Sequence, residues 1–310
     1  MRVAVTGAAG FVGRALVRRL RENGHEVLGF DLRAGEGVSV WDIGAGPLPG
    51  APKVDGVVHV AAYVSDSGPV GPARRVNVEG TKHVVQSFPR VRFVHISTCS
   101  VYNPHRPQET ARETEAPPAS AIRWTNAYGR TKAEAERLLS GVRPDAVVLR
   151  PHAVYGPGDT TLQPRLRAAA RRGWFPLPGD GTQRHSVTSV DNLVSACLLG
   201  LEPGAPAGVY NISDPESVRI ADALALLSAP RGGRPVPIRP MPALPLKVLA
   251  TLVEDGFAVA GRVRGRVVTP PISAYTVEHL AKERTFDIGA ARERLGYTPA
   301  PSILDQAPTW

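Results

Sequence analysis

Short apolar runs alternate with longer amphipathic segments through the first half of the chain. The runs are rich in β-branched residues, which favour strands, and the segments between them have the spacing of helices. Strands are expected near residues 3–5, 26–30, 56–60, 92–97 and 146–149, and helices near 11–22, 72–87 and 126–139. This alternation predicts an α/β fold with a doubly wound parallel sheet, whose ligand lies at the carboxyl ends of the strands.

The pattern changes from about residue 155. Proline and glycine become frequent there and the apolar runs become shorter, which predicts a smaller, irregular α/β substrate lobe. Residues 187–201 have helical spacing and residues 208–212 read as a strand, and we expect both to return to the main sheet. The expected dinucleotide-binding domain covers residues 1–155 and 186–213, and the expected substrate lobe covers 156–185 and 214–310.

Composition narrows the class of protein. The chain has 310 residues and is 43% hydrophobic, which is typical of a globular protein. Its net charge is +9, but the arginines are scattered, so no nucleic-acid partner is expected. Cys99 and Cys197 are too few for a disulfide framework and fit a reducing, cytoplasmic location. No metal site is expected.

One apolar stretch, residues 244–260, is long and has helical spacing. It predicts a helix that faces the core of the smaller lobe. A lid over a hydrophobic pocket and a surface helix that touches a membrane are the alternatives. Glu254 and Asp255 interrupt the stretch, and no run reaches the roughly 20 residues that a bilayer requires, so no integral span is expected.

The first strand runs directly into a glycine-rich turn, Thr6–Gly13, of sequence TGAAGFVG. Gly7 allows a tight turn, Gly10 lets the backbone approach a pyrophosphate, and Gly13 lets the following helix lie close to the strand. The spacing is GxxGxxG rather than GxGxxG. The start of that helix, with Phe11 and Val12, offers backbone N–H groups and the positive end of a helix dipole. This predicts a Rossmann-type dinucleotide site.

Asp31 ends the second expected strand, eighteen positions after Gly13. An acid in this place can accept hydrogen bonds from the ribose hydroxyls of NAD and would repel the extra phosphate of NADP. An ordinary turn residue is the alternative, since Asp favours turns. Leu32 and Arg33 follow, and because Arg33 could bind a phosphate, NAD is expected and NADP is not excluded.

Tyr128 and Lys132 open the third expected helix, four positions apart. They therefore project from one face, where a lysine ammonium favours the phenolate and lowers the pKa of the phenol. Such a pair can move a proton on or off a carbinol oxygen. Thr98 and Ser100 follow the fourth strand, and a hydroxyl there can hold the substrate oxygen, although capping of the strand end is the alternative.

Taken together, these motifs resemble those of the extended short-chain dehydrogenase/reductase superfamily over nearly the whole chain. The resemblance identifies Tyr128 and Lys132 with the family's YxxxK pair, Thr98 with its catalytic Ser or Thr, and Asn77 with the helix asparagine that supports the active site. It further implies cofactor contacts at Asp42 and Ile43 (adenine), at Ala61 and Ala62 (the HxAA strand end), and at Pro151 and Val154 (the nicotinamide).

The branch within the superfamily is indicated by a few positions and by two longer segments. Sugar-nucleotide dehydratases carry Asp-Glu after the catalytic Thr, whereas this chain has Cys99 and Ser100 there, so a dehydratase is disfavoured. Arg184 could clamp a diphosphate as in epimerases, but Ser186 replaces the usual aromatic residue. The segments 186–192 and 270–299 resemble 3β-hydroxysteroid-dehydrogenase-like members. Ser100, Tyr155 and Arg184 are the expected substrate contacts.

The expected function is an NAD-dependent dehydrogenase or ketoreductase that moves a hydride between nicotinamide C4 and a secondary alcohol or ketone of a small molecule. Tyr128 acts as acid and base, Lys132 holds the nicotinamide ribose, and Thr98 binds the substrate oxygen. A nucleotide-sugar epimerase with retained NAD is one alternative, and a non-catalytic dinucleotide sensor is another. A homodimer that pairs the helices at 72–87 and 126–139 is expected, because members of the superfamily often dimerise in this way.

Overall fold

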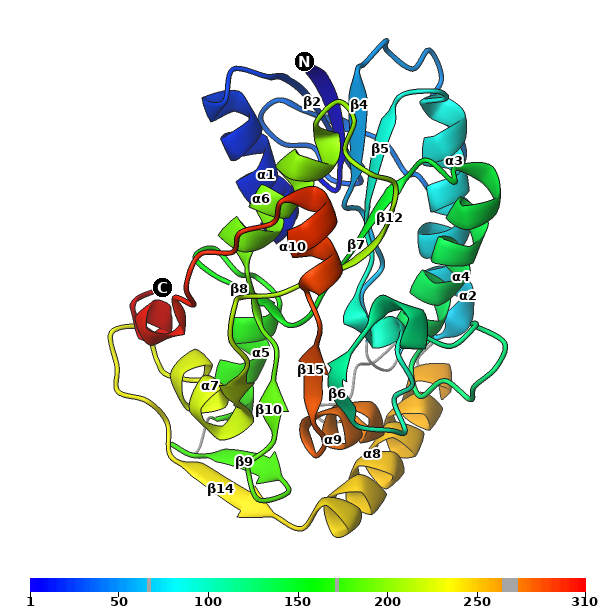
Figure 1. Cartoon of the computed structure of the whole chain (residues 1–310). Coiled ribbons are helices and arrows are strands. Elements are labelled where there is room, and N and C mark those ends of the chain that lie inside the picture. The colour runs from blue at the N-terminus through cyan, green and yellow to red at the C-terminus, as the bar shows by residue number, and fades with distance from the viewer. Residues whose placement is uncertain (66–67, 171–172, 264–272) are drawn as a thin grey trace.

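The computed structural model describes residues 1–65, 68–170, 173–263 and 273–310, with the backbone alone over 258–263 (Figure 1). A sheet of seven strands forms its centre, and every neighbouring pair in it is parallel. In spatial order the strands are β12 (Gly208–Ile212), β7 (Val147–Pro151), β5 (Arg92–Ile96), β4 (Gly56–His59), β1 (Arg2–Thr6), β2 (Glu26–Asp31) and β3 (Val38–Val40). The predicted doubly wound sheet is confirmed, including the return of residues 208–212 to it.

Helices cover both faces of this sheet, and each face has its own apolar core (Figure 1). On one face, α1 (Phe11–Glu22), α6 (Val190–Leu201) and α10 (Gly289–Leu295) contribute Leu16, Leu193 and Leu295 to a single cluster. On the other face, α3 (Gly80–Ser87) and α4 (Ala127–Val142) contribute Val84 and Leu139. Successive strand residues alternate between the two cores, which explains why the strands read as continuous apolar runs.

The expected helix at 72–87 consists of three consecutive pieces. These are α2 (Val70–Arg74), a π-helical turn (Arg75–Glu79) and α3. Single π-turns inside helices are rare and occur often at functional sites. This turn carries Asn77, whose side chain is buried. The two other expected helices of the first half are confirmed as α1 and α4.

Short strands and helices of varied length form the remainder of the chain (Figure 1). Four strands make a second sheet in the order β13 (Val218–Arg219), β10 (Arg184–His185), β15 (Arg284–Phe286) and β6 (Gln108–Ala111). Two strand pairs join β11 (Thr188–Ser189) to β8 (Val154–Tyr155), and β14 (Ile238–Met241) to β9 (Phe175–Pro178). The helices here are α5 (Leu162–Ala169), α7 (Ile220–Leu227), α8 (Ala243–Val263) and α9 (Ala274–Leu280), and 3₁₀ turns lie at Cys99–Val101, Glu113–Glu115 and Leu304–Thr309.

Helix α8 covers the expected apolar stretch and has two apolar faces. Leu246 and Ala250 pack with Val277 of α9 in a small core, as expected for a core-facing helix. Leu244 and Leu252 are largely exposed on the other face. None of the described helices is both long and apolar enough to cross a membrane. The expected division into two lobes stays a prediction. Helix α10 belongs to the segment 214–310, which was expected to form part of the substrate lobe, but it packs on the main sheet.

Candidate active site

The glycine turn between β1 and α1 leaves no room for side chains. Gly7 has a φ of +72°, and a Cβ there would lie 2.7 Å from the backbone nitrogen of Ala61. A Cβ on Gly13 would lie 2.0 Å from the Gly7 oxygen. Gly10 is the N-cap of α1 and no described side chain caps it, so the N–H groups of the first helical turn face outward for a ligand. A turn whose glycines allow such close approach of the backbone fits a pyrophosphate.

Asp31 closes the same turn from the neighbouring strand. Its carboxylate accepts hydrogen bonds from the backbone nitrogens of Ala9 and Arg33, both at 3.1 Å. The Arg33 guanidinium lies 3.9 Å from this carboxylate, and its side chain is 73% exposed. Leu32, between them, is also exposed. The acid is thus fixed at the end of β2, while the arginine is free to reorient.

Asp42 and Ile43 lie beyond β3 and belong to a different environment. The Asp42 carboxylate forms a close ion pair with Arg75 of the π-turn and accepts a hydrogen bond from Gly44 at 2.9 Å. Ile43 is buried against Gly80 of α3, where any side chain in place of Gly80 would collide with it. The predicted adenine contact at Asp42 would therefore share its carboxylate with Arg75.

Asn77 joins the end of β4 to the helix that carries the Tyr–Lys pair. The chain leaves β4 through Ala61 and Ala62, and the Asn77 amide then binds Tyr63 twice, accepting from its nitrogen at 2.7 Å and donating to its oxygen at 3.1 Å. The same amide nitrogen donates to the Thr131 hydroxyl at 2.9 Å. Asn77 is buried, and its amide ties the segment after β4 to α4.

The start of α4 lies against the loop after β5. Asn126 caps the helix by accepting from the Gly129 nitrogen at 2.7 Å, which places Tyr128 in the first turn, half-buried. A Cβ on Gly129 would lie 2.4 Å from the Ser100 oxygen. Only glycine at this position lets the helix approach the loop so closely. Gly129 stands inside the YxxxK motif, and its role could be recognised only from this contact.

Lys132, one turn further on, is fully buried at the end of β5. Its Nζ donates to the Ile96 oxygen at 2.5 Å and lies 3.1 Å from Nε2 of His95. Burial lowers the pKa of Lys132 to about 7, although the carboxylate of Glu136 acts in the opposite direction. Burial first, and then the charge of Lys132, keep the pKa of His95 well below its ordinary value. The amine is therefore close to its titration point at neutral pH beside a neutral imidazole.

Glu136 continues this face of α4 and was missed by sequence reasoning. Its carboxylate pairs with the Arg150 guanidinium of β7 at 2.6 Å and accepts from the Ser97 hydroxyl at 2.5 Å. Both charged side chains are almost fully buried. A buried pair with these added hydrogen bonds fixes α4 to β5 and β7. The i, i+4 spacing of Lys132 and Glu136 was the available signal.

Thr98 and Ser100 form the hydroxyl pair that the sequence predicted. The Thr98 hydroxyl accepts from the Ser100 nitrogen at 3.1 Å and donates to the Ser100 hydroxyl at 3.2 Å. The Ser100 hydroxyl also lies 3.2 Å from the phenol oxygen of Tyr275 on α9. Helix α9 therefore covers this loop, a contact between distant segments that no sequence pattern indicated.

The remaining predicted residues lie in β7, β8 and β10. Pro151 ends β7 and Val154 begins β8. Tyr155, however, is fully buried, and its hydroxyl donates to Asp214 at 2.5 Å. Arg184, in β10 of the second sheet, donates to the Ser217 hydroxyl at 2.8 Å. Tyr155 and Arg184 are thus occupied by protein partners rather than gathered with Thr98 and Ser100.

A cleft of about 530 Å³ opens at the start of α4. Ala127 and Arg130 of α4 line it together with Trp124 and with Glu254 of α8. It joins the helix that carries Tyr128 to α8, so the cleft extends from the candidate catalytic helix toward the apolar helix of the smaller lobe.

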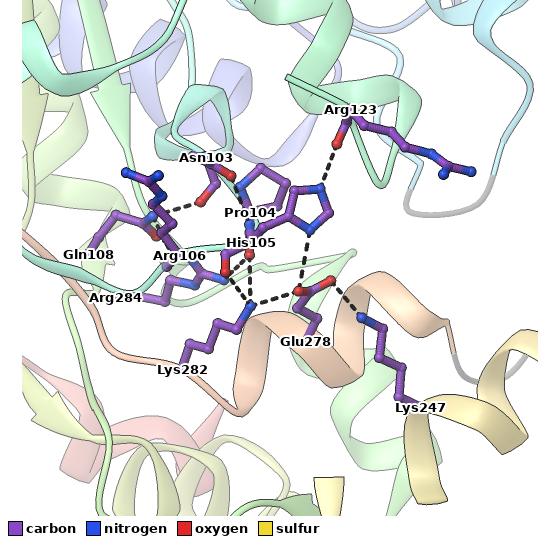
Figure 2. A network of polar contacts seen from close by, with 10 residues as sticks. All are labelled: Asn103, Pro104, His105, Arg106, Gln108, Arg123, Lys247, Glu278, Lys282 and Arg284. Carbon is purple, nitrogen blue, oxygen red and sulfur yellow. Dashed lines mark hydrogen bonds and ion pairs between the residues drawn. The ribbon is translucent and has the colours of Figure 1, made fainter. Parts of the chain in front are cut away.

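Helix α9 is held in place by a network of charges (Figure 2). Glu278 binds Lys282 at 2.6 Å, Lys247 of α8 at 3.3 Å and His105 at 3.5 Å. Burial pushes the pKa of Glu278 up, but the hydrogen bonds and charges of the two lysines outweigh it and leave the pKa below its ordinary value. The network anchors α9 to α8 and to the segment 103–108.

Comparison with known proteins decides the family. The model of the NAD dependent epimerase/dehydratase family matches residues 3–213. The chain belongs to this family. It is 30% identical over 328 residues to the 2-alkyl-3-oxoalkanoate reductase of Stenotrophomonas maltophilia, covering 98% of this chain and 96% of the relative. It is also 30% identical to a 3-beta-hydroxysteroid dehydrogenase of Mycolicibacterium neoaurum, with 96% of this chain and 87% of the relative covered.

Among solved structures, MoeE5 in complex with UDP-glucose and NAD superposes with a TM-score of 0.71. It is 24% identical and the match covers 100% of this chain and 97% of that one. The fold prediction is confirmed by this likeness. Family membership and the named relatives confirm an NAD-dependent oxidoreductase of the extended short-chain dehydrogenase/reductase type.

Proposed function

We propose that the chain is a dehydrogenase or ketoreductase for a hydrophobic secondary alcohol or ketone, with Tyr128 as its acid and base. The observation that carries this proposal is the packing of α4 against the end of β5 and the loop that follows it. Gly129 lies against Ser100, and the Lys132 amine lies at the end of β5, two residues before Thr98. The Tyr–Lys pair and the hydroxyl pair therefore belong to one site.

The cofactor cradle fits NAD. Bound NAD(H) supplies the hydride acceptor or donor at C4 of its nicotinamide ring. Gly7, Gly10 and Gly13 leave space for the pyrophosphate, and the first turn of α1 offers its N–H groups. Asp31 would accept from the adenosine ribose, and Lys132 from α4 would bind the nicotinamide ribose. Ala61, Ala62, Pro151 and Val154 would line the cofactor along the sheet edge, with Asp42 and Ile43 at the adenine.

In the oxidation direction, Tyr128 takes the proton of the substrate hydroxyl, and in the reduction direction it returns that proton to the carbonyl oxygen. Thr98 and Ser100 hold that oxygen in place. Orientation of the substrate beside the phenol contributes most of the remaining rate enhancement. Asn77 holds α4 through its hydrogen bond to Thr131 and so keeps Tyr128 in position relative to Thr98.

Two observations support a hydrophobic substrate over a nucleotide sugar. The relatives at 30% identity are a 2-alkyl-3-oxoalkanoate reductase and a 3-beta-hydroxysteroid dehydrogenase, and neither name refers to a nucleotide sugar. Arg184, the expected diphosphate clamp of an epimerase, instead donates to Ser217. An alkyl-substituted 3-oxo or 3-hydroxy compound is therefore the proposed substrate class.

The test uses Tyr128→Phe with Tyr210→Phe as its matched control, since the Tyr210 hydroxyl binds only Pro206 at the far edge of the sheet among its described contacts. Tyr128→Phe is expected to bind NADH normally and to lose turnover of a 2-alkyl-3-oxoacid by about 100-fold or more. Near-normal turnover would reject the assigned role. Purified protein with retained NAD and no net cofactor turnover would instead indicate an epimerase, and a lack of any turnover would indicate a sensor.

We further propose a cytoplasmic homodimer that pairs α2, α3 and α4 with those of a second copy. These helices lie side by side on one face of the sheet (Figure 1), and α4 contacts both α2 and α3. Two-fold pairing is the commonest oligomeric arrangement. Sedimentation equilibrium of the wild-type protein and of Arg137→Glu on the outer side of α4 tests it, because a monomeric wild type would reject the proposal.

A further inference from the structure

Three histidines from distant parts of the chain meet beside the candidate active site. His152 directly follows β7, His185 lies in β10, and His279 lies on α9. One ring nitrogen from each lies within 4.8 Å of the others. His152 and His185 are buried and His279 is half-buried. Their rings are 5.1 to 5.7 Å apart by centroids.

The outer nitrogens of two of these rings are already committed. Nδ1 of His152 lies 2.6 Å from the Ser186 oxygen, and Nε2 of His185 lies 3.0 Å from the Lys282 oxygen. A carbonyl oxygen can only accept, so each of these nitrogens carries the proton. The opposite nitrogens, Nε2 of His152 and Nδ1 of His185, must then hold lone pairs. Histidines that bind metals almost always donate their other N–H to a carbonyl or carboxylate in this way.

We propose that His152, His185 and His279 form a binding site for a divalent transition-metal ion, most naturally Zn²⁺. Three imidazoles with one open position are a common zinc ligand set. Nε2 of His152 and Nε2 of His279 lie 3.0 Å apart, so the two rings already converge on one point. Because Nε2 of His152 holds a lone pair, Nε2 of His279 carries the proton in this contact, and the site requires that this proton move to Nδ1 so that the Nε2 lone pair can bind the metal.

The surroundings keep the imidazoles in the form that binds metals. Burial lowers the pKa of His152 to about 4, although its hydrogen bond to the Ser186 backbone acts in the opposite direction. Burial and the neighbouring imidazoles also hold the pKa values of His185 and His279 well below the ordinary value. All three rings are therefore neutral at pH 7. Neutral imidazole is the metal-binding form, so binding needs a change of tautomer at His279 but no net loss of a proton from the three rings.

Arg284 is the charge that opposes a cation here, since it lowers the pKa of each of the three histidines. Its terminal nitrogens donate to the oxygens of Pro104 and Arg106, both at 2.9 Å, and to the Gln108 side chain. The guanidinium is thereby directed at the segment 104–108. We therefore expect an affinity below that of a buried site without a neighbouring arginine.

The ion would join α9 to the end of β7. Helix α9 also carries Tyr275, whose phenol reaches Ser100, and the Glu278 network of Figure 2 anchors the helix independently. The three histidines are therefore held in position before any ion binds. Metal binding would fix the wall that α9 forms over the hydroxyl pair, without taking part in hydride transfer.

The test uses the full chain without an affinity tag, freed of metal by a chelator and titrated with Zn²⁺ and then with Co²⁺. Wild type is expected to bind one equivalent, to show the visible ligand-field bands of low-symmetry Co²⁺, and to unfold at a higher temperature with Zn²⁺. His279→Gln and His185→Gln are each expected to weaken binding by roughly 100-fold, because loss of even an outer partner costs roughly 10–100-fold.

His83→Gln is the matched control, because His83 is a half-buried histidine that also bonds a backbone oxygen, that of Ile43 at 2.7 Å, but stands apart from the cluster. It is expected to bind metal as wild type does. Failure of the wild type to bind a single equivalent overturns the proposal, whatever the variants do. Equal affinities in wild type and both cluster variants, with folding checked by circular dichroism, also overturn it.

Discussion

The amine of Lys132 lies 3.1 Å from Nε2 of His95, in the buried space behind the end of β5. Two basic groups in such proximity cannot both be protonated without a large cost. Burial lowers the pKa of the lysine to about 7 and keeps the imidazole neutral. The candidate catalytic lysine therefore changes its charge close to neutral pH.

The first prediction concerns the stability of the ligand-free protein above neutral pH. The pKa of Lys132 is about 7 when folded and about 10.5 when unfolded, so the unfolded chain binds more protons between these values. Stability should therefore rise with pH across this window, by up to about 1.4 kcal/mol per pH unit from this one group. Lys132→Met should remove this contribution. Urea unfolding at pH 7.5, 8.5 and 9.5 measures the slope.

Lys82→Met provides the control for that measurement, because Lys82 is exposed on α3. It should keep the wild-type slope. An equal slope in wild type and Lys132→Met would mean that the buried lysine has an ordinary pKa when folded.

The second prediction concerns acid. His59 bridges the hydroxyls of Thr6 and Thr81 at 2.7 and 2.9 Å, and burial, with a smaller effect of the Lys132 charge, lowers its pKa to about 3. The unfolded chain takes up a proton here near pH 6.5 and the folded protein does not. Stability is therefore present above pH 6.5 and is lost as the pH falls toward 3.

His59→Gln should make the free energy of unfolding fall less steeply with decreasing pH. The slope should be smaller by about 1.4 kcal/mol per pH unit, which corresponds to one proton, whatever the substitution does to stability at pH 7. Denaturant titrations at pH 6.5, 5.5 and 4.5 give the slope. His25→Gln, in the turn before β2 beside the chain start, is the control. If His59→Gln unfolded with the wild-type pH dependence, the histidine would not be neutral in the folded protein.

The third prediction separates a positioning role of Asn77 from a catalytic one. Because the buried Asn77 amide donates to Thr131 of α4, Asn77→Ala should lower kcat about tenfold or more by loosening α4, and NADH affinity should change little. Thr131→Val removes the acceptor of the same bond. The two changes should be non-additive in the double variant, with a coupling of about 0.5–3 kcal/mol. Strict additivity would show that the bond does not transmit the effect.

The fourth prediction concerns cofactor choice. Asp31 is fixed by the nitrogens of Ala9 and Arg33, and its charge would repel a 2′-phosphate. Asp31→Ser should shift the ratio of kcat/KM for NADPH over NADH upward by about tenfold or more, because the exposed Arg33 can then bind the phosphate. Steady-state rates with both cofactors measure the ratio. Asp31→Ser combined with Arg33→Ala should lose the gain, and a gain that persists would assign the phosphate to another residue.

The local elements could be predicted from the sequence because their signals are local. The turn at Gly7 and the pair Tyr128 and Lys132 each lie within one strand–helix unit, so spacing alone located them. The edge strand β3 was missed, since Val40 is largely exposed and gives no apolar run. The environment of a side chain was harder to predict: Tyr155 was expected to contact the substrate, but it is buried against Asp214.

Contacts between distant segments could not be predicted from the sequence. The cluster of His152, His185 and His279 joins positions up to 127 residues apart, and only the folded chain brings them together. The same holds for Ser100 and Tyr275, which are 175 residues apart. Tertiary packing sets these pairs, and a single sequence carries no pattern that reports it.

The last prediction concerns the close approach of α4 to the loop after β5. A Cβ on Gly129 would lie 2.4 Å from the Ser100 oxygen, which is backbone and cannot move aside without shifting the hydroxyl pair. Gly129→Ala should therefore displace Tyr128 from Thr98 and lower kcat by about 100-fold, at a stability cost of about 1–3 kcal/mol. Gly141→Ala in the same helix meets no described atom within 4 Å and should be neutral or slightly stabilising, because alanine favours helix. Steady-state kinetics and urea unfolding of the two variants make the comparison. Full activity of Gly129→Ala would show that the helix need not touch the loop for catalysis.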